Sequence, residues 1–438
     1  MLRYLATTLG LYGLLAASTA HAQTAPKPPF QFSRIDLQLY DEANALDRLL
    51  ESRGLVYSDP VLEQHLADIA APLLPKESME NVQWRFRILR DPLVNAFALP
   101  NGSIYINTGL IARVENDDQL AGVLAHEATH VAGRHSYLFN LSMRKKTVAI
   151  TALSAAAWWL PVGGIWGATI YAAANTSQVV LIFTIYGYSR ENEQEADVNA
   201  VERVKQAGRD PNQFIRVFAL LDRRLEPEPV PFIWRDHPKT EKRIAYLKQK
   251  LGLEGDVAAA PDPAYLDRMR PVFLQNIQLD LDSRCFRSAV DGAQRLAGAH
   301  PDDPDALFWL AESYRALGPR KPALGKEEQN DSGLRSAYGK MIKQTEQEET
   351  EKLAGTPEGR VLMEEHQRKA EELYRRAAGL DPRFAKAQLG LGMLYEQQHK
   401  PDSALMAYRK YLELAPSGVD RERVERRMAA LNSKGASQ

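Results

Sequence analysis

The chain has 438 residues, of which 45% are hydrophobic and 25% are charged, and its formal net charge is -1 at pH 7. This length suffices for roughly two or three domains, and the ordinary composition excludes wholesale disorder and collagen-like structure. The balanced charge argues against a nucleic-acid-binding protein, which normally carries a basic excess. The single cysteine excludes an intramolecular disulfide and a cysteine-based zinc cluster, so any metal has to be held by histidines and carboxylates.

The N-terminus has the pattern of a secretory signal peptide, which we place at residues 1–22. Arg3 supplies a basic start, Tyr4–Ala17 is mostly apolar and uncharged, and Ala20-His21-Ala22 is a small-x-small cleavage pattern. A secreted chain without disulfides fits a bacterial periplasm, so we expect a periplasmic protein. Residues 23–34 are expected to be a linker.

The next part of the chain predicts a mixture of helices and short strands. Periodic apolar residues predict helices, and alternation or turn residues predict strands. The helices are expected at Asp36–Arg53 and Pro60–Leu74, and the strands at Val82–Leu89, Asn95–Leu99 and Ser103–Asn107. Asn116 is expected to cap a further amphipathic helix, with Gln119 as its capping-box partner. After that helix, Thr147–Ser189 carries no charged residue.

The composition of residues 254–263 predicts a linker between two halves. We expect a domain of mixed α+β structure at residues 35–253 and an all-helical domain at residues 264–435. Three segments of the second half repeat the same offsets of 4, 7 and 12 residues, beginning at Ala289, Ala370 and Ala404. Each ends in a proline. This pattern resembles the tetratricopeptide repeat, in which small residues let paired helices approach closely. A charged insert is expected at residues 318–363.

The segment His126-Glu127-Ala128-Thr129-His130 carries the chemistry of the first half. On a helix, residues four apart lie on one face, so His126 and His130 can bind one cation. Glu127 lies beside the first ligand, where it can accept a proton from a metal-bound water. Tetrahedral zinc in a hydrolase needs a third protein ligand and keeps its fourth position for water.

The sequence offers two candidates for the third ligand. His135 lies five residues after His130 and one residue short of the metzincin pattern, so we assign it a structural role. Glu193 is the better candidate. If its segment is helical, Glu193 shares a face with Asp197, which can accept the outer N–H of a ligand histidine. The other interpretation of this segment is a solvated acidic helix face.

The two motifs HEATHVAGRH and SRENEQEAD together resemble those of the HtpX and CaaX-prenyl-protease family of zinc metallopeptidases. In that family the glutamate of Ser-Arg-x-x-Glu-x-x-Ala-Asp is the third zinc ligand, which selects Glu193 over Glu191 and Glu195. The segment from Asn95 to Ser103, with Asn95, Ala96 and Phe97, is similar to the strand and turn that border the family's substrate cleft. His237-Pro238 with Arg243 resembles its His-Pro-x-x-x-x-Arg tail.

The resemblance implies a gluzincin-type metallopeptidase domain with one Zn²⁺ per chain, followed by an all-α repeat solenoid. A signal peptide and C-terminal repeats resemble the periplasmic BepA-type branch, which is linked with outer-membrane protein assembly and quality control. We therefore expect an endopeptidase that degrades misfolded or stalled envelope proteins, with repeats that recruit clients or the assembly machinery. The alternative is a repeat-based chaperone or scaffold in which proteolysis is latent or incidental.

The sequence alone does not decide the role of His237 or the structure of the uncharged run. His237 could donate to the oxyanion of the reaction, or it could be a regulatory fourth zinc ligand. The uncharged run admits three interpretations: a hydrophobic flap over the active site that touches a membrane surface or client, a buried helix pair, or a transmembrane hairpin. Proline and glycines interrupt the run, and tryptophans in it suit a membrane–water interface, so we favour the flap with a peripheral membrane contact.

Overall fold

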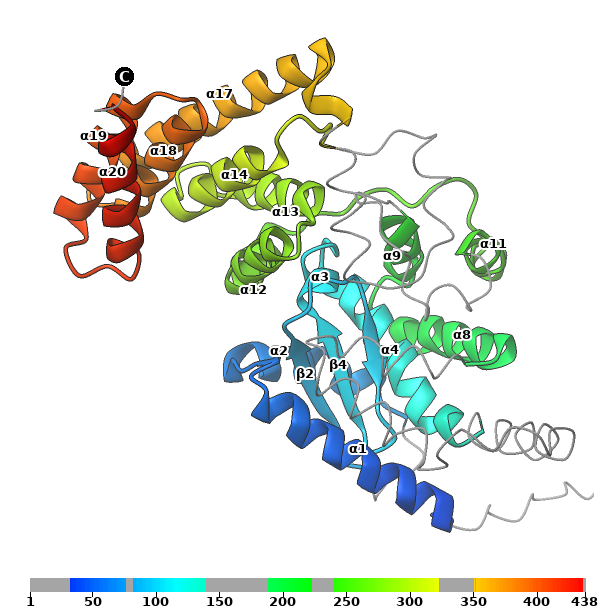
Figure 1. Cartoon of the computed structure of the whole chain (residues 1–438). Helices are drawn as coiled ribbons and strands as arrows, with labels where there is room; N and C mark the ends of the chain where they lie inside the picture. The colour runs from blue at the N-terminus through cyan, green and yellow to red at the C-terminus, as the bar shows by residue number, and fades with distance from the viewer. Residues whose placement is uncertain are drawn as a thin grey trace, which may run out of the picture.

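The computed structural model describes residues 32–75, 82–138, 188–222, 240–322, 350 and 352–435. Its N-terminal half is a small sheet with helices on both sides, and its C-terminal half is an arm of paired helices that extends away from the sheet (Figure 1). The expected architecture, α+β but mainly helical and followed by an all-α part, is confirmed.

The sheet of the first half has four described strands in the order β1-β2-β4-β3. They are β1 (Val56–Tyr57), β2 (Arg85–Leu89), β3 (Ala96–Ala98) and β4 (Ser103–Asn107). β2 and β4 are parallel, whereas the two outer pairs are antiparallel. β2 is three residues shorter than the predicted strand, because Val82–Trp84 precede the paired region. β3 lies at an edge, where one side of its backbone has no neighbouring described strand.

Helices cover both faces of this sheet. The helices of this half are α1 (Arg34–Ser52), α2 (Pro60–Ala70), η1 (Ala71–Leu73), α3 (Thr108–Ile111), α4 (Asp117–Ala132), α8 (Arg190–Gln206), α9 (Asn212–Asp222) and α11 (Thr240–Leu251). On one face, Leu46 and Leu50 of α1 pack in one cluster with Phe97 and Tyr105 of the sheet. On the other face, α4 packs with α2 and with strand residues such as Ala98, and α8 lies beyond α4.

The N-terminus of α4 is fixed by its capping residues. The Asn116 side chain accepts a hydrogen bond from the Gln119 N–H, which confirms the predicted N-cap. Gln119 differs from the predicted capping box, because its side-chain oxygen accepts from the N–H of Glu115 rather than of Asn116. From Gln119 to Val131 every residue of α4 is buried, so this helix runs through the centre of the domain.

The second half consists of antiparallel helix pairs. Its helices are α12 (Pro263–Asp282), α13 (Phe286–Ala299), α14 (Pro304–Leu317), α17 (Pro357–Leu380), α18 (Ala385–Gln397), α19 (Pro401–Leu414) and α20 (Arg421–Gly435). The small residues of the repeat pattern lie at the contacts between helices. A methyl group on Gly390 would lie 2.3 Å from the Tyr374 ring, and one on Gly392 would lie 2.4 Å from the Tyr408 ring. α17 begins at Pro357, inside the range in which the sequence predicts the charged insert.

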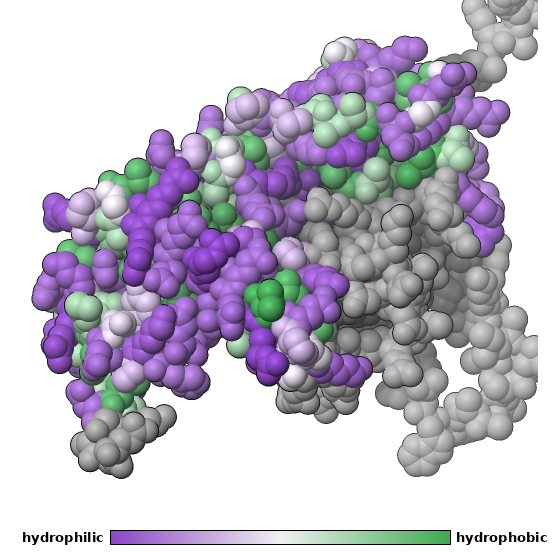
Figure 2. Space-filling model, turned by 90° about the horizontal axis from the view of Figure 1, so that it is seen from above, coloured by the Kyte–Doolittle hydropathy of each residue, from purple (hydrophilic) through white to green (hydrophobic). Residues whose placement is uncertain are grey.

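The surface of the described residues is mostly hydrophilic on the face shown in Figure 2, where hydrophobic residues form small scattered groups. Large hydrophobic side chains are exposed at separate places on the surface, such as Val61 on α2, Val361 on α17 and Met406 on α19. Scattered exposure of this kind is ordinary for a soluble surface. Among the described residues, no helix combines the length and the apolar character that a membrane span needs.

The two halves are joined by a buried polar contact as well as by the chain itself. The Arg295 guanidinium on α13 donates to the carbonyl oxygens of Ala112 and Val114, the latter at 2.8 Å, in the turn after α3. The Tyr265 hydroxyl on α12 donates to the Ile111 carbonyl at 2.8 Å. These bonds satisfy carbonyls of the first half with donors of the second, so the junction is a specific interface.

The linker between the halves also contacts α4. The Asn116 side chain donates to the Ala260 carbonyl at 2.8 Å, and the Asp262 N–H donates to the Glu115 carbonyl at 3.0 Å. The residues at the start of α4 therefore cap this helix and also form hydrogen bonds with the linker that leads to the repeats.

We predict that Arg295→Met destabilises the junction. The substitution keeps the apolar stem but leaves two carbonyls without their donor, at a cost of about 1–3 kcal/mol for each buried group. Thermal denaturation should show a lower Tm, by about 2–4 °C per kcal/mol for a domain of this size. Limited proteolysis should show faster cleavage within residues 252–262. Arg409→Met, at an exposed position of α19, serves as the control; equal Tm values and digestion for both variants would contradict the prediction.

Candidate metal centre

Two histidines of α4 share one face, as the spacing predicts. The Nε2 atoms of His126 and His130 lie 3.0 Å apart, and both side chains are buried. Burial of two imidazoles in the middle of a domain requires polar partners, because an unpaired buried polar group is costly. These partners come from α8 and from the turn that follows α4.

α8 brings a carboxylate to the two imidazoles. Ser189 caps the helix by accepting from the Asn192 N–H, and this fixes the rotation of the first turns. Glu193 then points at α4 with both oxygens 3.5 Å from an imidazole, one from His126 Nε2 and the other from His130 Nε2. Glu193 is completely buried. The expected helical segment is confirmed, and Glu193 belongs to the site rather than to a solvated face.

The donor atoms of His126, His130 and Glu193 have the separation that one metal ion requires. All three lie within 4.8 Å of one another. In a tetrahedral zinc site with bonds of about 2.0–2.1 Å, neighbouring ligand atoms are about 3.3 Å apart. The measured separations of 3.0–3.5 Å are close to this value. The residues present therefore fit a single ion with two nitrogen ligands and one oxygen ligand.

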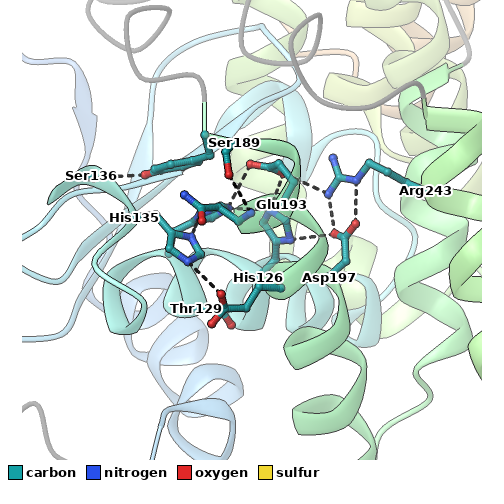
Figure 3. Close-up of polar contacts among 12 residues, drawn as sticks. His126, Thr129, His135, Ser136, Ser189, Glu193, Asp197 and Arg243 are labelled. Carbon is teal, nitrogen blue, oxygen red and sulfur yellow. Dashed lines mark hydrogen bonds and ion pairs between the residues drawn. The ribbon is translucent and has the colours of Figure 1, made fainter. Parts of the chain in front are cut away.

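A second carboxylate of α8 holds the outer nitrogen of the first histidine. Asp197 lies one helical turn after Glu193, and its Oδ1 is 3.0 Å from His126 Nδ1 (Figure 3). This contact leaves Nε2 of His126 facing Glu193 and His130. The geometry is the one predicted for Asp197 from its spacing on α8.

Arg243 of α11 balances the charge of the two buried carboxylates. Its Nε and a terminal nitrogen donate to Asp197 at 2.8 and 2.5 Å, and the same guanidinium is 3.5 Å from Glu193 (Figure 3). Burial acts to raise the pKa of Asp197, but the Arg243 charge and the His126 contact outweigh it and lower that pKa. Asp197 is therefore ionised in the interior. Tyr246 of α11 also donates to Asp197, a contact that the sequence did not indicate.

Glu127 lies between the two histidines in sequence and beside the edge strand in space. Burial raises the pKa of its carboxyl to about 7, and the N–H of Ala98 in β3 donates to it. Glu127 is buried but is not one of the three clustered donors. Its carboxylate is thus held at the edge strand, within electrostatic range of His126 and Glu193.

The three residues expected at a substrate cleft have different orientations. Phe97 pairs with Tyr105, and its ring stacks on the Tyr105 ring with centroids 5.1 Å apart, on the α1 side of the sheet. Asn95 is buried, and its carbonyl accepts from the Asn107 N–H. In an antiparallel pair of this register, alternate residues direct their backbone groups outward. Ala96 and Ala98 therefore direct their backbone groups to the side of β3 that has no described strand partner, where the Ala98 N–H donates to Glu127.

The surroundings of His130 include residues that the sequence did not connect with the site. The Tyr188 ring stacks on the His130 ring with centroids 3.9 Å apart and planes 13° apart. His135 contacts the outer nitrogen of His130 instead of joining the three donors. Tyr188 directly precedes the helix cap Ser189, but no spacing rule relates it to a residue 58 positions earlier. His237 and residues 147–187 of the uncharged run lie outside the described residues.

Comparison with known proteins agrees with this geometry. A model of peptidase family M48 matches residues 60–251, and a model of the tetratricopeptide repeat matches residues 365–419. The "Putative beta-barrel assembly-enhancing protease" of Vibrio cholerae serotype O1 is 28% identical over 280 residues, which is 63% of this chain and 52% of the relative. The "Beta-barrel assembly-enhancing protease" of Escherichia coli K12 is 27% identical over 237 residues, 52% of this chain and 47% of the relative.

A second group of relatives is named for a mitochondrial metalloendopeptidase. The "Mitochondrial metalloendopeptidase OMA1" of Schizosaccharomyces pombe is 27% identical over 189 residues, 43% of this chain and 52% of the relative. The chain thus spans about half the length of the curated relatives that it matches. The matched regions include both helices of the metal centre and part of the repeats. The chain therefore contains a metallopeptidase domain of peptidase family M48 at residues 60–251 and a tetratricopeptide-repeat segment at residues 365–419.

Proposed function

We propose that this chain is a zinc-dependent endopeptidase that cleaves unfolded or stalled envelope proteins in the periplasm. The observation that carries the proposal is the buried cluster of His126, His130 and Glu193, whose donor atoms lie within 4.8 Å of one another beside Glu127. Two imidazoles and one carboxylate with a neighbouring buried glutamate are the groups that a zinc hydrolase needs.

Zinc is the metal that this donor set fits. Calcium and magnesium prefer six or more oxygen ligands, whereas two nitrogens and one oxygen at tetrahedral separations suit zinc. Asp197 accepts from the outer nitrogen of His126 and so directs Nε2 of that ring toward the ion. Arg243 lies within 3.5 Å of both carboxylates and supplies positive charge to them in the interior. When bound, zinc supplies a Lewis acid that polarises the peptide carbonyl and makes water acidic enough to react near neutral pH.

Glu127 is the proposed general base and acid. Its carboxylate takes the proton of the attacking water and passes it to the nitrogen of the leaving amine. The bond between peptide carbon and nitrogen breaks, and the products are a free carboxylate and a free amine. The Ala98 N–H donates to the Glu127 carboxylate and holds it at the edge strand. The base therefore keeps a fixed position relative to a substrate strand bound at this edge. For the developing oxyanion, His237 is our candidate donor, with the fourth-ligand role as the rival.

The edge of β3 that has no described strand partner indicates the form of the substrate. The backbone groups of Ala96 and the carbonyl of Ala98 face this edge, and an extended peptide can pair with such an edge as an added strand. This mode of binding requires a segment that is not already folded. An endopeptidase built in this way selects misfolded or stalled chains over compact native proteins.

Location and partners follow from the sequence and from the names of the relatives. The expected signal peptide supports a periplasmic location. Relatives in Vibrio and Escherichia are named for the enhancement of β-barrel assembly, which supports a role beside outer-membrane protein assembly and quality control. Tetratricopeptide repeats present an extended concave surface to protein partners. We propose that these repeats recruit clients or the assembly machinery, and that the uncharged run makes peripheral contact with the membrane.

Removal of the third ligand should remove the metal. We predict one zinc per wild-type chain and little or none in Glu193→Gln, because the amide cannot replace the buried carboxylate charge. Elemental analysis of the purified, dialysed proteins measures this. Glu191→Gln, an exposed change on the same helix, is the control and should keep its zinc. Equal zinc contents in the Glu193 variant and the control would contradict the assignment.

Removal of the base should stop cleavage without loss of the metal. We predict that Glu127→Gln binds zinc normally but cleaves a denatured outer-membrane β-barrel protein at least about 100-fold more slowly, which is the lower range for general acid–base catalysis. Gel analysis of timed digests measures the rate, and elemental analysis verifies the metal. Cleavage at the wild-type rate would overturn the endopeptidase proposal. If client levels in cells also stay unchanged in the variant, the scaffold alternative holds.

A further inference from the structure

His135 is a buried histidine for which the proposed reaction has no use. Its side chain is only 1% exposed, although it lies three residues beyond the end of α4. Its Nδ1 is 2.7 Å from Nδ1 of His130, and its ring is nearly perpendicular to the His130 ring, at 76°. Burial of this imidazole against His130, a proposed metal ligand, requires a physical explanation.

The local backbone is built to bring this ring back to the helix. α4 ends at Ala132, and Arg134 then adopts a positive φ of 53°, which turns the chain sharply. That conformation is uncommon for a residue with a side chain. Arg134 is held there by hydrogen bonds to Asp36 on α1, one of them 2.9 Å long, and by its stacking over the Tyr137 ring at 4.0 Å.

Gly133 provides the space that the ring occupies. A methyl group on Gly133 would lie 2.4 Å from His135 Nε2 and 2.8 Å from its Cδ2. Both distances are shorter than the closest approach of non-bonded atoms. The Gly133 position therefore has to lack a side chain for His135 to adopt this position. The Tyr188 ring encloses the other side of the pair, since it stacks on His130 and meets His135 edge-on with centroids 5.8 Å apart.

Metal binding at Nε2 of His130 would decide which of the two histidines donates in this hydrogen bond. The Nε2 atom of His130 faces His126 and Glu193, so it has to be free of a proton when it binds a metal. The proton of neutral His130 is then on Nδ1, and it is donated to His135 Nδ1. His135 in turn carries its own proton on Nε2, which points toward Glu195 with 3.7 Å between nitrogen and oxygen. The Glu195 side chain is 56% exposed, so this chain of contacts ends at the solvent.

We infer that His135 is a positioning residue for the metal: it accepts the Nδ1–H of His130 and thereby holds the ligand nitrogen toward the ion. Asp197 does the same for His126 from the other side of the cluster. The two ligand histidines thus have different partners at their outer nitrogens. The partner of His126 is the carboxylate of Asp197, and the partner of His130 is the imidazole of His135. This inference rests on the proposed zinc site but assigns a function to a residue that is neither ligand nor base.

The test compares two variants that differ only in the acceptor. His135→Leu keeps an apolar side chain of similar size but removes the acceptor, and we expect about 10–100-fold weaker zinc binding, as for other supports of ligand histidines. His135→Asn places its Oδ1 where Nδ1 was, so it should bind zinc within about 3-fold of the wild type. Competition with a chromophoric chelator measures the dissociation constants of the full-length proteins. The visible absorption of bound Co²⁺ should change in the leucine variant and not in the asparagine variant.

A second buried histidine separates this effect from a loss of stability. His366 of α17 is 2% exposed and its Nδ1 bonds the Gly318 carbonyl at 2.7 Å, within the repeat half. His366→Leu should lower the Tm but leave zinc affinity and the Co²⁺ spectrum unchanged. Wild-type affinity in His135→Leu, or an equal loss in His135→Leu and His135→Asn, would overturn the inference while the zinc site stands. If the wild-type chain itself binds no zinc, the proposed function fails and the inference fails with it.

Discussion

The site depends on the placement of two carboxylates of α8 against two imidazoles of α4 in the buried interior of the domain. Glu193 and Asp197 are fully buried, and ionised carboxylates are stable there only with compensating partners. Arg243 supplies a permanent positive charge to both, and the imidazoles supply hydrogen bonds. The arrangement keeps a negative charge beside the imidazole nitrogens before any ion arrives. Two carboxylates beside one guanidinium favour a cation at this point.

One helix connects this site with the rest of the molecule. The middle of α4 carries His126, Glu127 and His130, whereas its N-terminal residues bond the linker that leads to the repeats. Asp117 at the same end contacts Arg268 of α12 at 3.0 Å. The repeat half is therefore attached to the first turn of the helix that carries the donor cluster.

The sequence indicated much of this arrangement and missed specific parts of it. The spacing of His126 and His130 and the capping residue Asn116 predicted a helix with both imidazoles on one face, and helical periodicity placed Glu193 and Asp197 together. The small and aromatic residues of the repeats predicted the paired helices. Such features follow from local rules. The strand at Val82–Leu89 was too long in the prediction, because alternation continues into residues that have no pairing partner.

The contacts that the sequence missed depend on how distant segments meet. The stacking of Tyr188 on His130, the bond from Tyr246 to Asp197 and the Ala98 N–H on Glu127 join residues whose spacing follows no local rule. The structural role expected for His135 left its partner undefined, because its distance in sequence suggested a residue rotated away from the ligands. The positive φ of Arg134 reverses the chain and brings the ring back. Helical periodicity cannot predict a position after the helix has ended.

The most direct test of the account is a zinc anomalous difference map from crystals of the full-length, zinc-loaded protein. We predict one peak per chain, within about 2.0–2.2 Å of Nε2 of His126, Nε2 of His130 and an oxygen of Glu193. Absence of a peak at this position, or a peak at which Glu193 lies outside bonding distance, would contradict the central claim.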